Sequence, residues 1–134
     1  MENIHKLLST FLSHRIPWLL ECPRGSALWK ESCIRQIVDH PAVETVLSDR
    51  CQFGSRWKLT VRYASAKLTE DVARLNHTCR THNKLCSRTH RAHLPLKGRA
   101  PNGASYTNLA KNKPGKLIQA LAYILLDAAR AHFE

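Results

Sequence analysis

The sequence predicts a single α/β or α+β domain, in which helices pack on a small sheet. Three observations predict this class: apolar residues recur at helical spacing near both ends, a short apolar run is followed by a second helical pattern, and one later segment alternates at period two. The chain has 134 residues, of which 43% are hydrophobic, and this suits one domain over residues 1–134. A core can form at this size without disulfides.

The first forty residues are expected to run helix, strand, helix. Apolar side chains from Ile4 to Leu12 recur at helical spacing, and Pro17 prevents that helix from continuing much past Arg15. A short apolar run, 18–20, reads as a buried strand that ends in the polar turn 21–26. Ser26 is a suitable N-cap for a second helix, which the His40–Pro41 pair closes.

Strands and then helices are expected in the rest of the chain. Residues 43–47 are rich in β-branched side chains, and residues 57–63 alternate apolar with polar, so both read as strands. A short helix is expected over 68–75, a helical turn over 106–111, and a largely buried helix over 117–128. Between them, Asn76–Gly103 has little periodicity and reads as an irregular or metal-organised loop.

The charge of the chain is strongly and unevenly positive. There are 21 Lys and Arg against 10 Asp and Glu, a formal net charge of +11. No acidic residue lies between Asp71 and Asp127, whereas ten basic residues do: Arg74, Arg80, Lys84, Arg88, Arg91, Lys97, Arg99, Lys111, Lys113 and Lys116. A surface that serves solubility alone usually mixes both signs. The pattern therefore predicts contact with a nucleic acid or another polyanion, and the binding should depend strongly on salt.

The N-terminus and the longest apolar run indicate the compartment. Residues 1–14 lack the features of a secretory signal, and the apolar run 117–126 is too short to span a membrane. We expect an intracellular protein, nuclear or cytoplasmic, that does not bind membranes. Its five Cys should be free thiols or metal ligands there.

Metal-ligating residue types cluster within the irregular loop, in the pattern Cys79-x6-Cys86-x3-His90-x2-His93. Thiolates and neutral imidazoles are the ligands that zinc prefers, and four of them close a tetrahedral structural site. Cys51 is able to replace either histidine, and the set we select is Cys51, Cys79, Cys86 and His93. The spacing matches no zinc finger, ribbon or knuckle, and His-rich basic chains also occur without a metal.

Two further segments are candidates for ligand contacts. Glu21 follows an apolar strand, where open α/β sheets place ligand-binding groups, although an acid in a turn is commonly just solvated. The segment 51–62 carries Arg56, Lys58 and Arg62 beside the aromatic residues Phe53 and Trp57, and so offers both phosphate contacts and stacking surfaces. The alternative is a hairpin loop with core aromatics. With the loop cations, the predicted nucleic-acid-binding set is Arg56, Lys58, Arg62, Arg80, Lys84, Arg88 and Arg91.

Several short motifs in order give the chain a family resemblance. They are Glu21-Cys22-Pro23, the run Ser26-Ala27-Leu28-Trp29, the loop from Cys51 to Thr60, and Cys86, His93 and Leu96 to Gly98. Read together from about residue 14 to residue 129, this chain resembles the C-terminal half of divergent DNA cytosine-5 methyltransferase-like proteins. The resemblance implies a partial Rossmann-like sheet flanked by helices, with a basic irregular loop.

The same resemblance implies roles for particular residues. Glu21 would be the catalytic-site residue that holds the pyrimidine edge of a flipped cytosine, while Lys58 and Arg62 would contact the base and the DNA backbone. Cys22 replaces the family's Asn, and Leu59 stands where related sequences carry Pro. The chain also lacks the Gly-rich segment for S-adenosylmethionine and the Pro-Cys nucleophile element.

Three functions are therefore expected as alternatives. The first is a basic nucleic-acid-binding domain, for DNA more than for RNA, that is inactive as an enzyme by itself. The second is one half of a split methyltransferase, in which a companion chain supplies the S-adenosylmethionine site. The third is a basic interaction protein stabilised by zinc.

Overall fold

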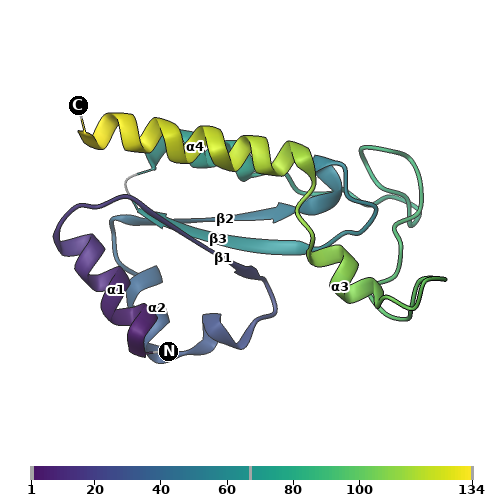
Figure 1. Ribbon diagram of the computed structural model, residues 1–134, viewed down its shortest axis with the longest axis horizontal. Coiled ribbons are helices and arrows are strands. Elements are labelled where there is room, and N and C mark those ends of the chain that lie inside the picture. The colour runs from purple at the N-terminus through teal and green to yellow at the C-terminus, as the bar shows by residue number, and fades with distance from the viewer. Residues whose placement is uncertain (1, 67, 134) are drawn as a thin grey trace.

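The computed structural model describes residues 2–66 and 68–133, which form three strands with helices on both faces (Figure 1). The elements are, in order, α1 Glu2–Ser13, β1 Trp18–Pro23, the 3-10 helix η1 Ala27–Lys30, α2 Ser32–Val38, β2 Val43–Asp49, the 3-10 helix η2 Arg50–Phe53, β3 Thr60–Ala66, the 3-10 helix η3 Thr69–Leu75, α3 Tyr106–Lys111 and α4 Gly115–Phe133. The expected α/β class is confirmed.

The sheet has the strand order β1-β3-β2, and β3 runs antiparallel to both neighbours. The outer strands β1 and β2 are therefore parallel to each other, and α2 lies between them in the chain, but β3 is inserted between them in the sheet. This is a split β-α-β arrangement. A Rossmann-like sheet requires neighbouring parallel strands, so the finer expectation of a partial Rossmann-like sheet is not confirmed. The sequence contains the strand–helix–strand passage, but it does not reveal where the third strand enters.

Two hydrophobic cores lie on the two faces of the sheet. Because side chains alternate along a strand, Ala64 and Ala66 of β3 face α1, η1 and α2, together with Trp29 and Ile34. Val61 and Tyr63, which alternate with these residues along β3, face α4 and η3, where they pack with Leu117 and Ile124. Figure 1 shows α4 across one face of the sheet and α1 with α2 on the opposite face.

The elements differ from the expectations in several places. The final helix, expected over 117–128 and largely buried, is α4 over Gly115–Phe133, and it buries Leu117 and Ile124 but leaves Ile118, Leu125 and Leu126 exposed. The second helix is interrupted: Ser26 caps η1, accepting a hydrogen bond from the backbone N–H of Leu28 through its side chain, and Glu31 is extended before α2 begins. The strand expected over 57–63 is β3, which begins at Thr60 instead because residues 50–53 form η2 and 54–59 return the chain to the sheet. The expected helix over 106–111 is confirmed as α3.

Residues 76–105 form the predicted irregular loop, which lies beyond the ends of β1 and β2 (Figure 1). Only isolated bridges occur in this part of the described chain, for example between His82 and Leu85. Among the described residues, no helix is both long and apolar enough to cross a membrane. The loop and the start of η2 together form the region in which the predicted metal ligands fall.

Candidate metal centre

Three thiols and one imidazole converge where the loop meets η2. The ligand atoms of Cys51, Cys79, Cys86 and His93 all lie within 4.8 Å of one another. The Sγ atoms of Cys79 and Cys86 are 3.9 Å apart, and Cys79 Sγ lies 3.6 Å from His93 Nε2. The three cysteines are buried and make a core cluster of their own. The structure thus brings together the four predicted ligands, and of the two candidate histidines it places His93 in the group.

These distances fit a tetrahedral metal ion. A Zn–S bond of about 2.3 Å places the sulfur atoms of a regular tetrahedron about 3.8 Å apart, since an edge is about 1.63 times the bond length. The observed sulfur separation of 3.9 Å matches this edge. A disulfide needs sulfur atoms at about 2.05 Å, and the cysteines are free thiols. The cluster therefore has the composition and the spacing to hold a metal ion such as zinc.

Cys51 and Cys79 are held in place from the end of β2. Cys51 lies in η2, directly after the strand, and is 1% exposed. The buried carboxylate of Asp49 accepts a hydrogen bond from the backbone N–H of Cys79 at 2.6 Å and another from the Thr60 hydroxyl. The backbone N–H of Asp49 also donates to the carbonyl of His77 at 2.8 Å. Asp49 therefore ties the first loop cysteine to the sheet.

A tight turn separates the two loop cysteines. His82 and Leu85 exchange both backbone hydrogen bonds, at 3.2 and 2.9 Å, around Asn83 and Lys84. Both turn residues have positive φ, 49° and 63°, which is the two-residue turn of type I′ that is common in hairpins. This turn reverses the chain so that Cys86 returns to Cys79.

A second set of contacts surrounds the sulfur atoms. Gln52 Nε2 lies 3.4 Å from Cys51 Sγ and 3.8 Å from Cys86 Sγ, so its amide donates toward two sulfurs. Both the backbone N–H and the hydroxyl of Ser87 donate to Cys79 Sγ, at 3.5 and 3.6 Å. Such outer contacts orient metal ligands and tune their basicity.

The surroundings shift the pKa values of Cys51 and Cys79 in opposite directions. Burial raises the pKa of Cys51 to about 12, and the hydrogen bond from Gln52 offsets this only in part. Burial also acts to raise the pKa of Cys79, but hydrogen bonds with Thr81 and Ser87 outweigh it and lower that pKa to about 6. Cys79 is therefore largely a thiolate at neutral pH, which is the form that binds a metal.

The loop cations of the predicted nucleic-acid set lie on the outside of the irregular loop 76–105. Arg80, Lys84, Arg88 and Arg91 are all exposed. Arg56 is exposed on the neighbouring segment that leads into β3, and Lys58 Nζ contacts the Thr81 hydroxyl at 3.1 Å. Six of the seven predicted cations thus belong to the metal loop or to the segment packed beside it.

Arg62 and Glu21 do not lie together. Arg62 pairs with Cys22 in the sheet, on the α1 and α2 face, and its guanidinium lies over the Trp29 ring at 5.5 Å. Glu21 pairs with Tyr63 on the opposite face. The sheet therefore separates the two residues that the methyltransferase resemblance assigns to one flipped base.

Glu21 is engaged in ion pairs. Its Oε1 atom lies 3.2 Å from Arg50 Nη2 and 3.2 Å from Lys113 Nζ. Burial, and next the charge of Glu21, raise the pKa of the neighbouring Tyr63 hydroxyl. Arg50 is itself buried and donates to the carbonyls of Ala110 and Lys111, so it also closes the C-terminus of α3.

The two aromatic residues proposed as stacking surfaces have different environments. Phe53 is 8% exposed and belongs to the core, where its ring meets His77 edge-on with 5.6 Å between ring centroids. Trp57 is half-buried against Tyr106, and its indole N–H donates to the carbonyl of Pro95 at 3.2 Å. Phe53 is therefore a core residue, which was the alternative to a stacking surface.

Sequence reasoning missed Asp49, Gln52 and Ser87, which contact the ligand residues, and the buried Arg50, which binds Glu21 and the end of α3. Each is polar and adjacent to a ligand or separated from one by a single residue, but that placement is common on any surface. The only usable signal is Asp49-Arg50, two adjacent charged residues at the end of a β-branched strand.

Comparison with protein-family models, with curated proteins and with solved structures finds no match to this chain.

Proposed function

We propose that the chain is a nucleic-acid-binding domain whose basic loop is folded around one structural zinc ion. The observation that carries this proposal is the convergence of four metal-ligating atoms within 4.8 Å where η2 meets the loop that bears the exposed cations. Residues 76–105 of the described chain contain no helix or strand and only isolated bridges. A closed four-ligand site would supply the missing folding energy.

The ligand set favours zinc in a structural role. Three thiolates and one imidazole form a Cys3His set, which is typical of structural zinc sites. Four protein ligands leave no position for a water or a substrate, as a catalytic zinc requires. We therefore assign the metal to folding the loop, and no reaction to the metal itself.

The distribution of charge supports a nucleic-acid partner. The stretch between Asp71 and Asp127 contains ten basic residues and no acidic one, and the loop cations Arg80, Lys84, Arg88 and Arg91 point to solvent. Clustered Lys and Arg on one face attract phosphate backbones, and displacement of counterions drives the binding. We favour DNA over RNA as the partner, as expected from the sequence.

The methyltransferase resemblance stays a prediction, and so does a companion chain with an S-adenosylmethionine site. The proposal depends on neither. The position of Glu21, paired with Arg50 and Lys113, gives it a stabilising contact in this structure. A basic interaction protein with the same zinc site but no nucleic-acid affinity is the alternative outcome of the experiment below.

The first experiment measures metal and binding on the same sample. Metal analysis should find one zinc per chain, and removal by a chelator should increase protease cleavage within residues 76–105. Fluorescence anisotropy with duplex DNA and with RNA, at several salt concentrations, should show binding that weakens steeply with salt and is lost with the zinc. Metal well below one equivalent, or no binding at low salt, would contradict the proposal.

A charge-matched pair of variants locates the binding surface. Changing Arg80, Lys84, Arg88 and Arg91 to Gln should reduce the slope of log affinity against log salt by about 0.9 for each phosphate group that the variant no longer neutralises. The control changes Lys6, Arg24, Lys30 and Arg35, four exposed cations in the N-terminal part of the chain, to Gln. Both variants remove the same charge, so an equal effect would exclude the loop as the binding surface.

A further inference from the structure

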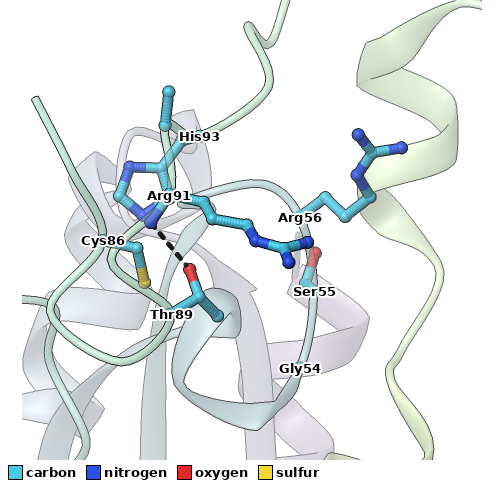
Figure 2. A pocket seen from close by; sticks show the side chains of 8 residues that line it. Gly54, Ser55, Arg56, Cys86, Thr89, Arg91 and His93 are labelled. Carbon is cyan, nitrogen blue, oxygen red and sulfur yellow. Dashed lines mark hydrogen bonds between the residues drawn. The ribbon is translucent and has the colours of Figure 1, made fainter.

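A pocket of about 450 Å³ opens beside the metal cluster. One wall is the segment Gly54–Arg56, and the other is the loop from Cys86 to His93. Two metal ligands, Cys86 and His93, thus line the pocket as well as the cluster (Figure 2). Its volume lies within the range of pockets that hold small ligands.

Backbone hydrogen bonds fix both walls relative to the metal ligands. The N–H of Leu94, next to His93, donates to the carbonyl of Arg56 at 2.9 Å. The N–H of Cys86 donates to the carbonyl of Arg91 at 2.8 Å, and the N–H of Arg91 donates to the Thr89 hydroxyl at 3.4 Å. The positions of both arginines therefore depend on the fold of the metal cluster.

The pocket is cationic. The residues that line it include two arginines, Arg56 and Arg91, and no Asp or Glu. Within the described residues, neither guanidinium has an ion-pair partner, unlike Arg50, which has Glu21. Figure 2 shows the Arg91 side chain extended across the pocket toward Ser55, whereas the Arg56 side chain leaves the same wall and points away from Arg91. Arginine suits phosphate because its planar donors match two phosphate oxygens.

We propose that this pocket binds one phosphodiester group of a nucleic-acid backbone, that Arg91 is the side chain that recognises it with Arg56 as a second cation of the wall, and that the pocket forms only when the metal cluster is assembled. The proposal rests on the nucleic-acid-binding function proposed above and identifies the site of one of its contacts. Arg91 contacts the group from the loop wall, and the hydroxyls of Ser55 and Thr89 offer further hydrogen bonds.

One other explanation for the two arginines follows from the chemistry of the cluster. Zinc with three thiolates carries one net negative charge, and nearby cations would stabilise it. In that case the arginines would raise zinc affinity and bind no phosphate. The two explanations give opposite results in the following measurements.

Titration of the zinc-loaded protein with inorganic phosphate tests the pocket directly. We expect saturable NMR shifts at the backbone amides of Gly54 and His93, absent from the Arg56→Gln/Arg91→Gln variant and from the chelated protein. Duplex DNA should displace the phosphate. Absence of saturation, or saturation that the DNA does not displace, would overturn the proposal, and so would a variant that loses zinc affinity but keeps the phosphate response.

DNA binding is then compared between two double variants of equal charge. Arg56→Gln/Arg91→Gln should bind DNA about tenfold or more weakly than Lys84→Gln/Arg88→Gln, which removes two loop cations outside the pocket. If both double variants lose the same affinity, the pocket is not the phosphate site, although the proposed nucleic-acid function still holds. If the wild-type chain binds no DNA, the nucleic-acid function fails and this phosphodiester assignment with it, whereas the phosphate titration still reports whether the pocket takes an anion.

Discussion

Replacement of Asp49 tests whether one buried carboxylate organises the metal loop. Asp49 is 3% exposed and accepts hydrogen bonds from the Cys79 N–H and the Thr60 hydroxyl. In Asp49→Asn, the remaining oxygen can accept from Cys79 while the new amide donates to Thr60, whose hydroxyl also accepts. Both bonds survive without their charge, which costs about 1 kcal/mol each, or about 2 kcal/mol in total.

Asp49→Ala should cost more, because the Cys79 N–H then has no partner. An unsatisfied buried N–H costs about 1–3 kcal/mol beyond the loss of the bonds, so we expect a total of about 3–5 kcal/mol. Thr60 is only half-buried and can turn its hydroxyl to water. The expected order of stability is wild type, then Asp49→Asn, then Asp49→Ala, and zinc affinity should fall in the same order.

The assay is urea unfolding at one fixed excess of free zinc, because bound metal adds its own stabilisation. The control is Asp39→Ala, an exposed residue at the C-terminus of α2, where the change should stay within about 0.5 kcal/mol. If Asp49→Ala shifts the free energy of unfolding by less than about 1 kcal/mol, Asp49 does not hold the loop as we argue.

Three further predictions concern single residues. Gly54→Ala should cost about 1–2 kcal/mol in thermal unfolding, because φ is 106° there although nothing lies within 4 Å of the added Cβ; Gly25→Ala, equally open and without positive φ, should cost less. Arg50→Met should destabilise by about 3 kcal/mol in urea, because Glu21 and two carbonyls of α3 lose a buried donor; a change below about 1 kcal/mol would contradict this. In competition with a chelator, zinc affinity should fall by an additional factor of about ten per pH unit below about pH 6, where free Cys79 takes up a proton; an unchanged slope there would refute the lowered pKa.

The metal cluster was predictable in its residue types more than in its geometry. Two cysteines and two histidines in a segment without helical or strand periodicity leave few roles for those side chains, so the ligand chemistry could be read directly. His93 was selected over His90 without a reason in the local pattern, because that reason lies in a turn: His90 has φ of 57°, and its N–H bonds to the carbonyl of Cys86. Cys51 reaches the metal cluster because η2 directly follows β2 in the chain.

The strand order of the sheet, β1-β3-β2, could not be predicted from the sequence. A short apolar run, a group of β-branched residues and a period-two alternation indicated β1, β2 and β3 respectively. Strand order depends on long-range pairing, which leaves no local pattern. Glu21 and Arg62 illustrate the result: both could be assigned to strands near a basic surface, but the register places them on opposite faces.

The central position of β3 sets the order in which the chain can fold during synthesis. Trp18 pairs with Ala66 and Pro23 with Val61, so β1 leaves the ribosome long before its partner is made. Its hydrogen-bonding edge must wait for β3, whereas β2 and β3 are close in sequence and can pair as soon as both emerge. Until then the nascent N-terminal segment exposes apolar side chains such as Trp18 and Leu20, and a chaperone that shields them would raise the yield of folded protein.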